Sequence, residues 1–254
     1  QKEKTMMKRI LGIIIPLMIC ATLVAQDTPN IYGVNYFKPK ADQREEYLAG
    51  LKDHTKKHHS KGIMKVRTYQ VVSGDKSGWY VRVSGPLSWA DVDKFQADTR
   101  SKAHSSHAAK FVRPYIEERI GTMYWSPLED LGYNRDTSGK PSKMVRVNFT
   151  HVNTGMNGEY QELRKQIKEA HEKTSSNASF GVGHLVHGGD RHIFASFSPL
   201  DSWADMASTG PNLSSRINKV FGEGAWDRFL NKAQKINYKR HDEMRVYMKD
   251  YSTR

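Results

Sequence analysis

Side chains that bind anions recur at every second position in segments with the composition of β-strands. Arg67 and Tyr69 alternate in one such segment, and Tyr80 and Arg82 alternate in the next. Because successive side chains of a strand point to opposite faces, each pair lies on one face of its strand. Arginine binds a carboxylate or phosphate through two parallel hydrogen bonds. Converging arginines therefore predict a site for an anionic group, with tyrosines beside it to bind the rest of a small molecule.

Two asparagines extend this predicted set into both halves of the chain. Asn35 follows Val34, Asn148 follows Val147, and each asparagine alternates with apolar side chains. We expect the apolar face to lie under helices, which leaves the asparagines on the opposite face, where the ligand binds. The complete predicted ligand-binding set is Asn35, Arg67, Tyr69, Tyr80, Arg82, Asn148, His184 and Arg245. The sequence assigns no catalytic role to any of them.

Eleven histidines raise the question of a metal site. His54 and His58 are four residues apart in a predicted helix, a spacing that can place both imidazoles on one side. No glutamate or aspartate pattern completes a hydrolytic zinc site, and the second half of the chain has His171 in the position of His58. A histidine near a helix C-terminus, packed over a sheet, accounts for both. We therefore expect no metal and no cofactor; the sequence leaves open whether His54, His58 or His104 has a functional role.

The elements that must position these side chains follow from hydrophobic periodicity. Aromatic and β-branched residues predict strands. Tyr47, Leu48, Leu51 and Thr55 form one stripe of a helix, and Ser88 is placed to cap a second helix that begins at Trp89. In the first half of the chain, the predicted order is a strand at 31–37, a helix at 41–59, strands at 64–72 and 79–84, a helix from 89 and a strand at 120–125.

The second half of the chain repeats this order. The segment Pro86–Asp91 reads Pro-Leu-Ser-Trp-Ala-Asp, and Pro199–Asp205 repeats it with one inserted residue. We expect Trp89 and Trp203, which begin the second helix of each copy, to be buried core anchors. Each copy has the order strand, helix, strand, strand, helix, strand, which is the ferredoxin-like plan. The predicted units span 26–126 and 144–254, and a linker without periodicity spans 127–143.

A ferredoxin-like unit covers one face of its sheet with helices and leaves the other face to be buried. Two copies in one chain solve this by placing one sheet against the other. We therefore predict an α+β fold in which two tandem ferredoxin-like βαββαβ units pack sheet to sheet as an intramolecular α/β barrel. This arrangement resembles a fused form of the dimeric α/β-barrel superfamily. The fusion removes the need for a dimer but still allows a homo-oligomer.

The resemblance implies several activities. The superfamily includes cofactor-free monooxygenases of the antibiotic-biosynthesis type and haem-degrading enzymes. The latter imply an asparagine on the first strand and a tryptophan and a histidine on the second helix; Asn35 and His104 are similar in setting, whereas Lys94 and Phe95 stand where the tryptophan is expected. We expect a small anionic or aromatic molecule between the sheets, bound or oxidised without a cofactor. The alternatives are a structural or partner-binding module with a filled barrel and a haem protein.

The beginning of the chain has the pattern of a secretory signal peptide. Lys8 and Arg9 precede an apolar run at 10–19, and small residues lead to Ala25. We expect cleavage before Gln26 and a periplasmic or secreted protein that is free of the membrane after cleavage. The remainder keeps 36 basic and 26 acidic residues, well mixed, and loses the single cysteine. Mixed charges favour a solvated surface over a nucleic-acid partner, and no disulfide is expected.

Overall fold

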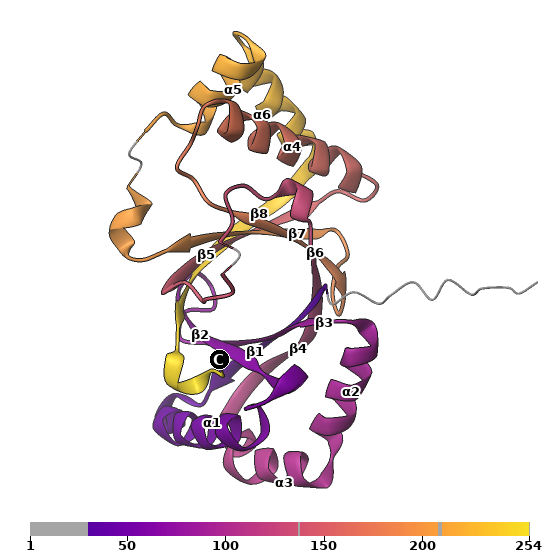
Figure 1. Cartoon of the computed structure of the whole chain (residues 1–254), viewed down its shortest axis with the longest axis vertical. Helices are drawn as coiled ribbons and strands as arrows, with labels where there is room; N and C mark the ends of the chain where they lie inside the picture. The colour runs from indigo at the N-terminus through magenta and orange to yellow at the C-terminus, as the bar shows by residue number, and fades with distance from the viewer. Residues whose placement is uncertain (1–29, 137, 208–209, 254) are drawn as a thin grey trace, which may run out of the picture.

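Eight strands close into a barrel in the computed structural model, which describes residues 30–136, 138–207 and 210–253 (Figure 1). The strand order around the barrel is β1-β3-β2-β8-β5-β7-β6-β4, and all neighbouring strands are antiparallel. The strands are β1 (Ile31–Pro39), β2 (Val66–Ser73), β3 (Tyr80–Leu87), β4 (Ile116–Pro127), β5 (Met144–Val152), β6 (Gly181–His187), β7 (Ile193–Leu200) and β8 (Asn237–Tyr247).

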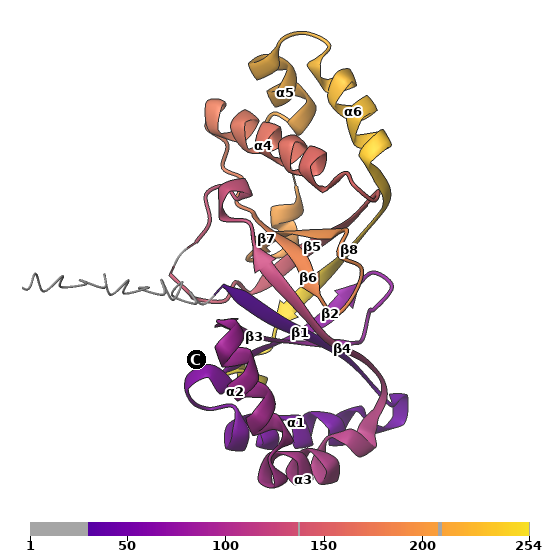
Figure 2. The ribbon, with the colours of Figure 1, turned by 90° about the vertical axis from the view of Figure 1, so that its right-hand side faces the viewer.

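Helices lie on two opposite sides of this barrel. The helices of the first copy cover one side and those of the second copy cover the other, as Figures 1 and 2 both show. The first group is α1 (Arg44–His58), α2 (Trp89–Arg100) and α3 (Lys102–Phe111), and the second is α4 (Asn157–Lys173), α5 (Leu213–Phe221) and α6 (Ala225–Ile236). Short 3-10 turns lie before, between or after these elements: η1 (Ala41–Gln43), η2 (Gly62–Met64), η3 (Arg113–Tyr115), η4 (Glu129–Leu131), η5 (Trp203–Met206) and η6 (Lys249–Tyr251).

Each copy contributes four adjacent strands in the ferredoxin-like order. The first copy supplies β4-β1-β3-β2 and the second supplies β8-β5-β7-β6. The copies are joined by hydrogen bonds along two seams, where β2 pairs with β8 and β4 pairs with β6. The predicted tandem α/β barrel is therefore confirmed. No strand edge is left open in the barrel, because each outer strand of one copy pairs with an outer strand of the other.

The repeated phrase turns out to be a helix-start signal rather than a core motif. Ser88 Oγ accepts a hydrogen bond from the Asp91 backbone N–H at 3.0 Å, and the Asp91 carboxylate accepts one from the Ser88 N–H at 3.2 Å. Ser202 and Asp205 form the same capping box in the second copy. Trp89 is 46% exposed and Trp203 55%, so the prediction that they are buried anchors was wrong. What the phrase specifies is the cap, which satisfies N–H groups at the helix start.

Hydrophobic residues fill both sides of the barrel wall. One cluster occupies the interior, and Val34, Tyr36, Val147 and Phe149 belong to it. Other clusters lie between the wall and the helices; Tyr47 and Tyr80 meet under α1, and Phe194 packs under the helices of the second copy. The prediction that the apolar faces of the first strands lie under helices was therefore wrong. Because both faces of a closed barrel are buried here, apolar character does not distinguish them.

The predicted signal peptide, residues 1–25, lies outside the described residues, as do Cys20 and the expected cleavage point before Gln26. Within 30–136, 138–207 and 210–253, no helix combines the length and the apolar character that crossing a bilayer requires.

Candidate functional site

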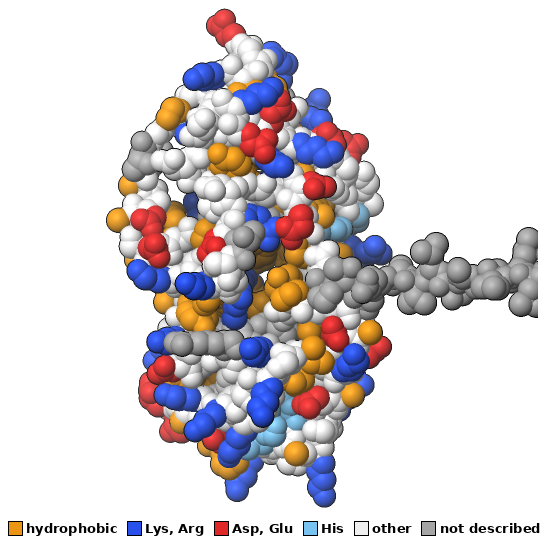
Figure 3. All heavy atoms as spheres, viewed as in Figure 1, with side chains coloured by type: hydrophobic (Ala, Val, Ile, Leu, Met, Phe, Trp, Pro, Cys, Tyr) orange, Lys and Arg blue, Asp and Glu red, His pale blue; other side chains and the backbone are white. Residues whose placement is uncertain are grey.

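One end of the barrel encloses a cavity of about 290 Å³. This is the end where β1 and β5 begin and β4 and β8 finish. Figure 3 shows a hollow in the middle of this face, with hydrophobic side chains and basic groups beside it. The walls are mostly aromatic and aliphatic. The lining residues used below are Tyr36, Arg67, Tyr69, Trp125, Phe149 and Arg245. Beyond them, Val71, Trp79, Val81, Leu185 and Ala195 belong to the cluster that fills the interior.

A buried network of Tyr36, Glu243 and Arg245 lies where the cavity meets this packed interior. Glu243 and Arg245 share the inner face of β8, and the carboxylate accepts a 2.6 Å hydrogen bond from Arg245 Nε. The Tyr36 hydroxyl donates to Glu243 at 2.8 Å and accepts from Arg245 Nη2 at 2.5 Å. All three are at most 5% exposed. The Glu243 carboxylate thus neutralises Arg245, the positively charged member of this network.

The protonation states in this network follow from burial and charge. Burial raises the pKa of Tyr36 above its ordinary value, and Glu243 adds to that shift while Arg245 opposes it. Burial works against the charged form of Arg245, but Tyr36 and Glu243 outweigh burial and raise the pKa of Arg245. Tyr36 is therefore a neutral hydroxyl at neutral pH and Arg245 a cation. The network holds the cavity floor rigid and leaves no net charge from the Glu243–Arg245 pair.

Arg67 brings a second guanidinium to the cavity from β2. Its Nη2 donates a 2.7 Å hydrogen bond to the backbone carbonyl of Gly139, and among the described residues no carboxylate lies within ion-pair distance of it. Tyr69 is two residues further along the same face. Burial raises the pKa of Tyr69, and the positive charges of Arg67 and Arg245 oppose that shift. Arg67 and the protonated Tyr69 hydroxyl therefore offer adjacent donors to an acceptor in the cavity.

The segment 127–143, which we predicted to be a linker, forms part of the cavity wall. Tyr133 pairs with Phe180 through two backbone hydrogen bonds, which fixes the start of the segment against the second copy. Arg135 forms an ion pair with Glu129. From there the chain passes the cavity, where Lys140 and the neighbouring prolyl and seryl residues line it. The bond from Arg67 to Gly139 ties this segment to the first copy.

Three of the eight predicted ligand-binding side chains reach this cavity: Arg67, Tyr69 and Arg245. Tyr80 and Arg82 do not, and the expectation that Arg67 and Arg82 share a face was wrong. In the β2–β3 pairing, Arg67 lies opposite Val83, whereas Arg82 lies opposite Thr68 on the other face.

Arg82 and Tyr80 instead lie between the barrel and α1. Arg82 donates to Thr55 Oγ1 at 3.0 Å, and burial lowers the pKa of Arg82 to about 10. The Tyr80 hydroxyl accepts a 2.8 Å hydrogen bond from Arg44 Nε.

Asn35, Asn148 and His184 also lie on the side of the wall away from the cavity. Asn35 Oδ1 accepts a 2.9 Å hydrogen bond from Thr122 Oγ1 and another from Arg119. Asn148 alternates with Val147 and Phe149, which belong to the interior cluster, so its side chain points outward. His184 contacts the Arg191 carbonyl at 2.7 Å and stacks on Phe194. The prediction that these three side chains point into the barrel was therefore wrong, as it was for Arg82: each lies on the outer face of its strand.

Sequence reasoning missed Tyr36, Glu243 and the aromatic walls. Tyr36 was assigned to the helix side with Val34. Glu243, Arg245 and Tyr247 alternate along β8, so one face of that strand carries two opposite charges and a phenol. Such a spacing predicts a salt bridge within one strand face. It could have identified the Glu243–Arg245 pair, although the contact with Tyr36 depends on the barrel being closed.

The residues that the superfamily resemblance assigned to haem do not fit that group. His104 Nε2 lies 3.0 Å from His54 Nε2, and its Nδ1 lies 2.9 Å from Asp98. Both ring nitrogens therefore have protein partners, and His104 does not line the cavity. In the described part of the chain, no histidine, cysteine or methionine lines that cavity. The cavity provides none of these axial ligands.

Comparisons with known proteins support the architecture. No family model matches the chain, and no curated protein sequence matches it. A candidate monooxygenase from Lactobacillus acidophilus matches in structure with 8% identity, a TM-score of 0.51 and coverage of 87% of this chain and 94% of that one. An anthrone oxidase-like protein matches with 11% identity and a TM-score of 0.54, covering 87% and 92%. Chlorite dismutase from Candidatus Nitrospira defluvii matches with 11% identity and a TM-score of 0.50, covering 88% and 93%. At these identities the likeness establishes the fold alone, a barrel of two ferredoxin-like units.

Proposed function

We propose that the barrel cavity binds a small aromatic molecule that carries an anionic group. The observation that carries this proposal is a largely apolar cavity, open at one end of the barrel, into which Arg67 extends with no carboxylate partner among the described residues. Its volume of about 290 Å³ lies near the lower end of the range usual for ligand pockets. The alternative of a filled, purely structural barrel is not supported by a cavity of this size.

The chemistry of the walls favours an aromatic ring for the body of the ligand. Trp125 and Phe149 have ring centroids 6.0 Å apart, and Tyr36 lies on the same wall. Rings of this kind gain from edge or offset contacts with a ligand ring. The anionic group would meet Arg67 and Tyr69, because a charge-assisted hydrogen bond to guanidinium is stronger than a neutral one. Arg245 contributes less, since Glu243 already neutralises it.

The test begins with native mass spectrometry of the protein purified from its own source, to identify a retained small molecule. In parallel, aromatic carboxylates and their matched neutral amides are compared by calorimetry. We expect the acids to bind at least tenfold more tightly, and Arg67→Met to remove that preference. Arg100→Met, an exposed arginine on α2, is the matched control and should change nothing. Equal affinity for acids and amides, or an unchanged preference in Arg67→Met, would exclude the anion site.

A second candidate is cofactor-free oxidation of the bound ring by O₂. It is favoured by the architecture shared with the anthrone oxidase-like protein and by a cavity with no histidine, cysteine or methionine among its described lining residues. The measurement is O₂ consumption by the purified protein in the presence of the aromatic molecule identified above, with a chelator present. Stable binding without O₂ uptake would leave the protein as a binder.

A further inference from the structure

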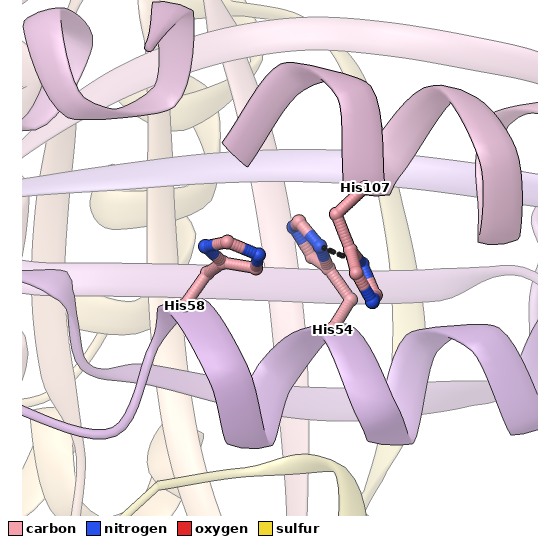
Figure 4. Close-up of side chains that lie close together, drawn as sticks. All are labelled: His54, His58 and His107. Carbon is pink, nitrogen blue, oxygen red and sulfur yellow. Dashed lines mark hydrogen bonds between the residues drawn. The ribbon is translucent and has the colours of Figure 1, made fainter. Parts of the chain in front are cut away.

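Five histidines gather outside the barrel, between α1 and α3: His54, His58, His59, His104 and His107. They lie on the helix side of the first copy, away from the cavity. His54 and His58 extend from α1, and His107 extends toward them from α3 (Figure 4). We propose that His54, His58 and His107 bind one divalent transition-metal ion of the Zn²⁺ type. This site is separate from the proposed ligand cavity and does not depend on it.

The three side chains already have nearly the geometry that a metal requires. One ring nitrogen from each lies within 4.8 Å of the others. His54 Nδ1 and His107 Nδ1 are 3.1 Å apart, and the His58 ring centroid lies 5.0 Å from that of His54 and 5.1 Å from that of His107. Two nitrogens bound tetrahedrally to zinc at 2.0–2.1 Å are about 3.3 Å apart. Small side-chain rotations therefore complete a three-histidine set.

The contacts through the cluster need one more proton or cation than its neutral imidazoles supply. Asp53, His107, His54, His104 and Asp98 form a chain of four contacts, each 2.9–3.1 Å long. Each contact needs one proton, and three neutral imidazoles carry only three. The fourth contact is served by a cation, either the Lys57 ammonium, which lies 3.3 Å from His107 Nε2 and 2.8 Å from Asp53, or a metal ion in the cluster. A metal between His54 Nδ1 and His107 Nδ1 satisfies that contact and leaves the other protons in place.

Carboxylates orient the imidazoles that would hold the ion. Asp53 contacts His107 Nε2, so His107 presents Nδ1 to the centre of the cluster. Such a carboxylate behind a ligating histidine is the usual support of a metal ligand. His54 is buried and His58 half-buried, and the neutral imidazole is the form that binds metals.

Two overlapping sets of three histidines could hold an ion, and the surrounding charges favour the set closer to solvent, His54, His58 and His107. His54, His59 and His104 form the other set with suitable spacing. Arg82 lies on the barrel side, where its positive charge acts on His54 and His59. A cation is disfavoured close to that guanidinium. His58 and His107 are half-buried and closer to solvent, with Asp53 and Asp98 nearby; Lys57, which pairs with Asp53, offsets part of that negative charge but is exposed to solvent.

The second copy shows how many histidines this helix requires for packing alone. Its α4 has one histidine at the corresponding position, His171, which packs between Tyr133 and Phe180. The helices α4, α5 and α6 of the second copy repeat neither the His-x-x-x-His spacing of α1 nor the His-x-x-His spacing of α3. Imidazole is a preferred ligand of zinc, copper and nickel. A metal therefore accounts for the additional histidines, which the shared fold does not require.

The test uses the full chain, freed of metal with a chelator and titrated with Zn²⁺ by calorimetry. We expect one ion per chain and a rise in melting temperature on binding. His107→Gln and His58→Gln should each weaken Zn²⁺ binding about 100-fold or more, since even an outer partner of a metal ligand is worth about 10- to 100-fold. Co²⁺ in place of Zn²⁺ should give the visible absorption of a tetrahedral site, which both variants should lose.

Two further variants make the outcome decisive. His171→Gln, in the second copy, should leave Zn²⁺ binding unchanged. His59→Gln separates the two ligand sets, because only the inner set uses it. No stoichiometric binding by the wild type, or equal affinity in the wild type, His107→Gln and His58→Gln, overturns the proposal. Loss of binding in His59→Gln with retention in His107→Gln assigns the ion to the inner set and also overturns it. Circular dichroism of each variant verifies folding; if His107→Gln does not fold, His58→Gln and Asp53→Asn decide.

Discussion

Buried arginines are tolerated for different reasons at Arg245, on the inner side of the barrel wall, and at Arg82, between the wall and α1. Arg245 has a carboxylate partner and a tyrosine hydroxyl. Arg82 has only the Thr55 hydroxyl, and its Nε has no hydrogen-bond partner among the described residues. A buried ion pair contributes little net stability, but a buried charge without its partner is costly. The two arginines should therefore respond differently to substitution.

Removing the carboxylate from the cavity floor should be more harmful than removing the whole pair. We expect Glu243→Gln to lower the free energy of unfolding by about 3–5 kcal/mol, because Arg245 stays buried and charged. The double variant Glu243→Leu with Arg245→Met should lose less than Glu243→Gln alone. Urea denaturation at pH 7 measures both. If the double variant is the less stable one, the pair is a net source of stability.

His171 should make the protein less stable in acid. Burial, assisted by Arg216 and Arg164, lowers the pKa of His171 in the folded state. Below the ordinary value of about 6.5, the unfolded chain binds a proton that the folded chain excludes, so stability falls as the pH falls through this region. His171→Gln should reduce this loss between pH 7 and 5 by less than about 1.4 kcal/mol per pH unit, the limit for one proton. His187→Gln, an exposed histidine, is the control; an equal pH slope in both variants would contradict the assignment.

The sequence predicted which residue types would line the cavity better than it predicted the face of the barrel wall on which each side chain lies. It placed Arg67, Tyr69 and Arg245 on the cavity side because these follow the strand alternation of their own segments. It misplaced Asn35 and Arg82, which lie opposite each other in the β1–β3 pairing and share the helix side. Polar side chains are expected in a cavity, yet here the helix side also holds them through hydrogen bonds to Thr122 and Thr55. The pairing register between neighbouring strands is needed to assign each side chain to the cavity side or the helix side.

The helix starts at Ser88 and Ser202 show how a repeated phrase can be a signal for an element. Its serine and aspartate form the cap, while its tryptophan stays half-exposed in both copies; the Trp89 ring lies 5.6 Å from that of the buried Tyr124. The two copies then differ. After Trp89 the chain makes α2 and α3, whereas the residues described between Trp203 and α5 include the 3-10 turn η5.

The cap should therefore matter at least as much as the larger side chain. We expect Ser88→Ala to lower the free energy of unfolding by about 0.5–2 kcal/mol, through loss of the cap. Trp89→Ala should cost clearly less than the 3–5 kcal/mol typical of a buried tryptophan. Ser106→Ala, an exposed site within α3, is the control and should be neutral or slightly stabilising. If Trp89→Ala lowered the free energy of unfolding by more than about 3 kcal/mol, Trp89 would be a core anchor after all.

The strands and first helices of both copies could be predicted because their periodicity is clear. The second helical region of the second copy is divided, by contrast, into η5, α5 and α6. Pro211 and Asn212 start α5, where Asn212 Oδ1 accepts a 2.9 Å hydrogen bond from the Ser215 N–H. Gly222 and Gly224 then separate α5 from α6 with φ of +91° and +70°, a region that favours glycine. These breaks are visible in the sequence as Gly-Pro-Asn and Gly-Glu-Gly, so composition indicated them where periodicity did not.

Closure of the barrel makes each copy depend on the other. Both seams join strands of different copies, and the interior cluster draws residues from both. One copy alone would expose the edges of β2 and β4 together with an apolar sheet face.

We therefore expect a fragment of residues 26–127, expressed by itself, to dimerise or aggregate. Light scattering coupled to size exclusion measures this directly, with the full chain as the reference. A folded, monomeric fragment would show that the interior contacts between copies contribute little.

We also expect the protein to be exported. The basic start, apolar run and small residues before Gln26 should direct cleavage there, which yields a periplasmic or secreted protein. N-terminal sequencing of the protein from its own source checks this. Residues 10–19 still attached, in material that requires detergent, would contradict it.

The strand order repeats after half a turn around the barrel, so β1 corresponds to β5 and β2 to β6. Two separate, identical copies would present a ligand with two equivalent poses related by that half turn. The fused chain has a single connecting segment, which passes the mouth at Gly139 and Lys140 and gives one half of the rim a different surface. The poses are then no longer equivalent. Covalent fusion thus removes the orientational degeneracy of the site and allows one stereochemically defined complex per chain.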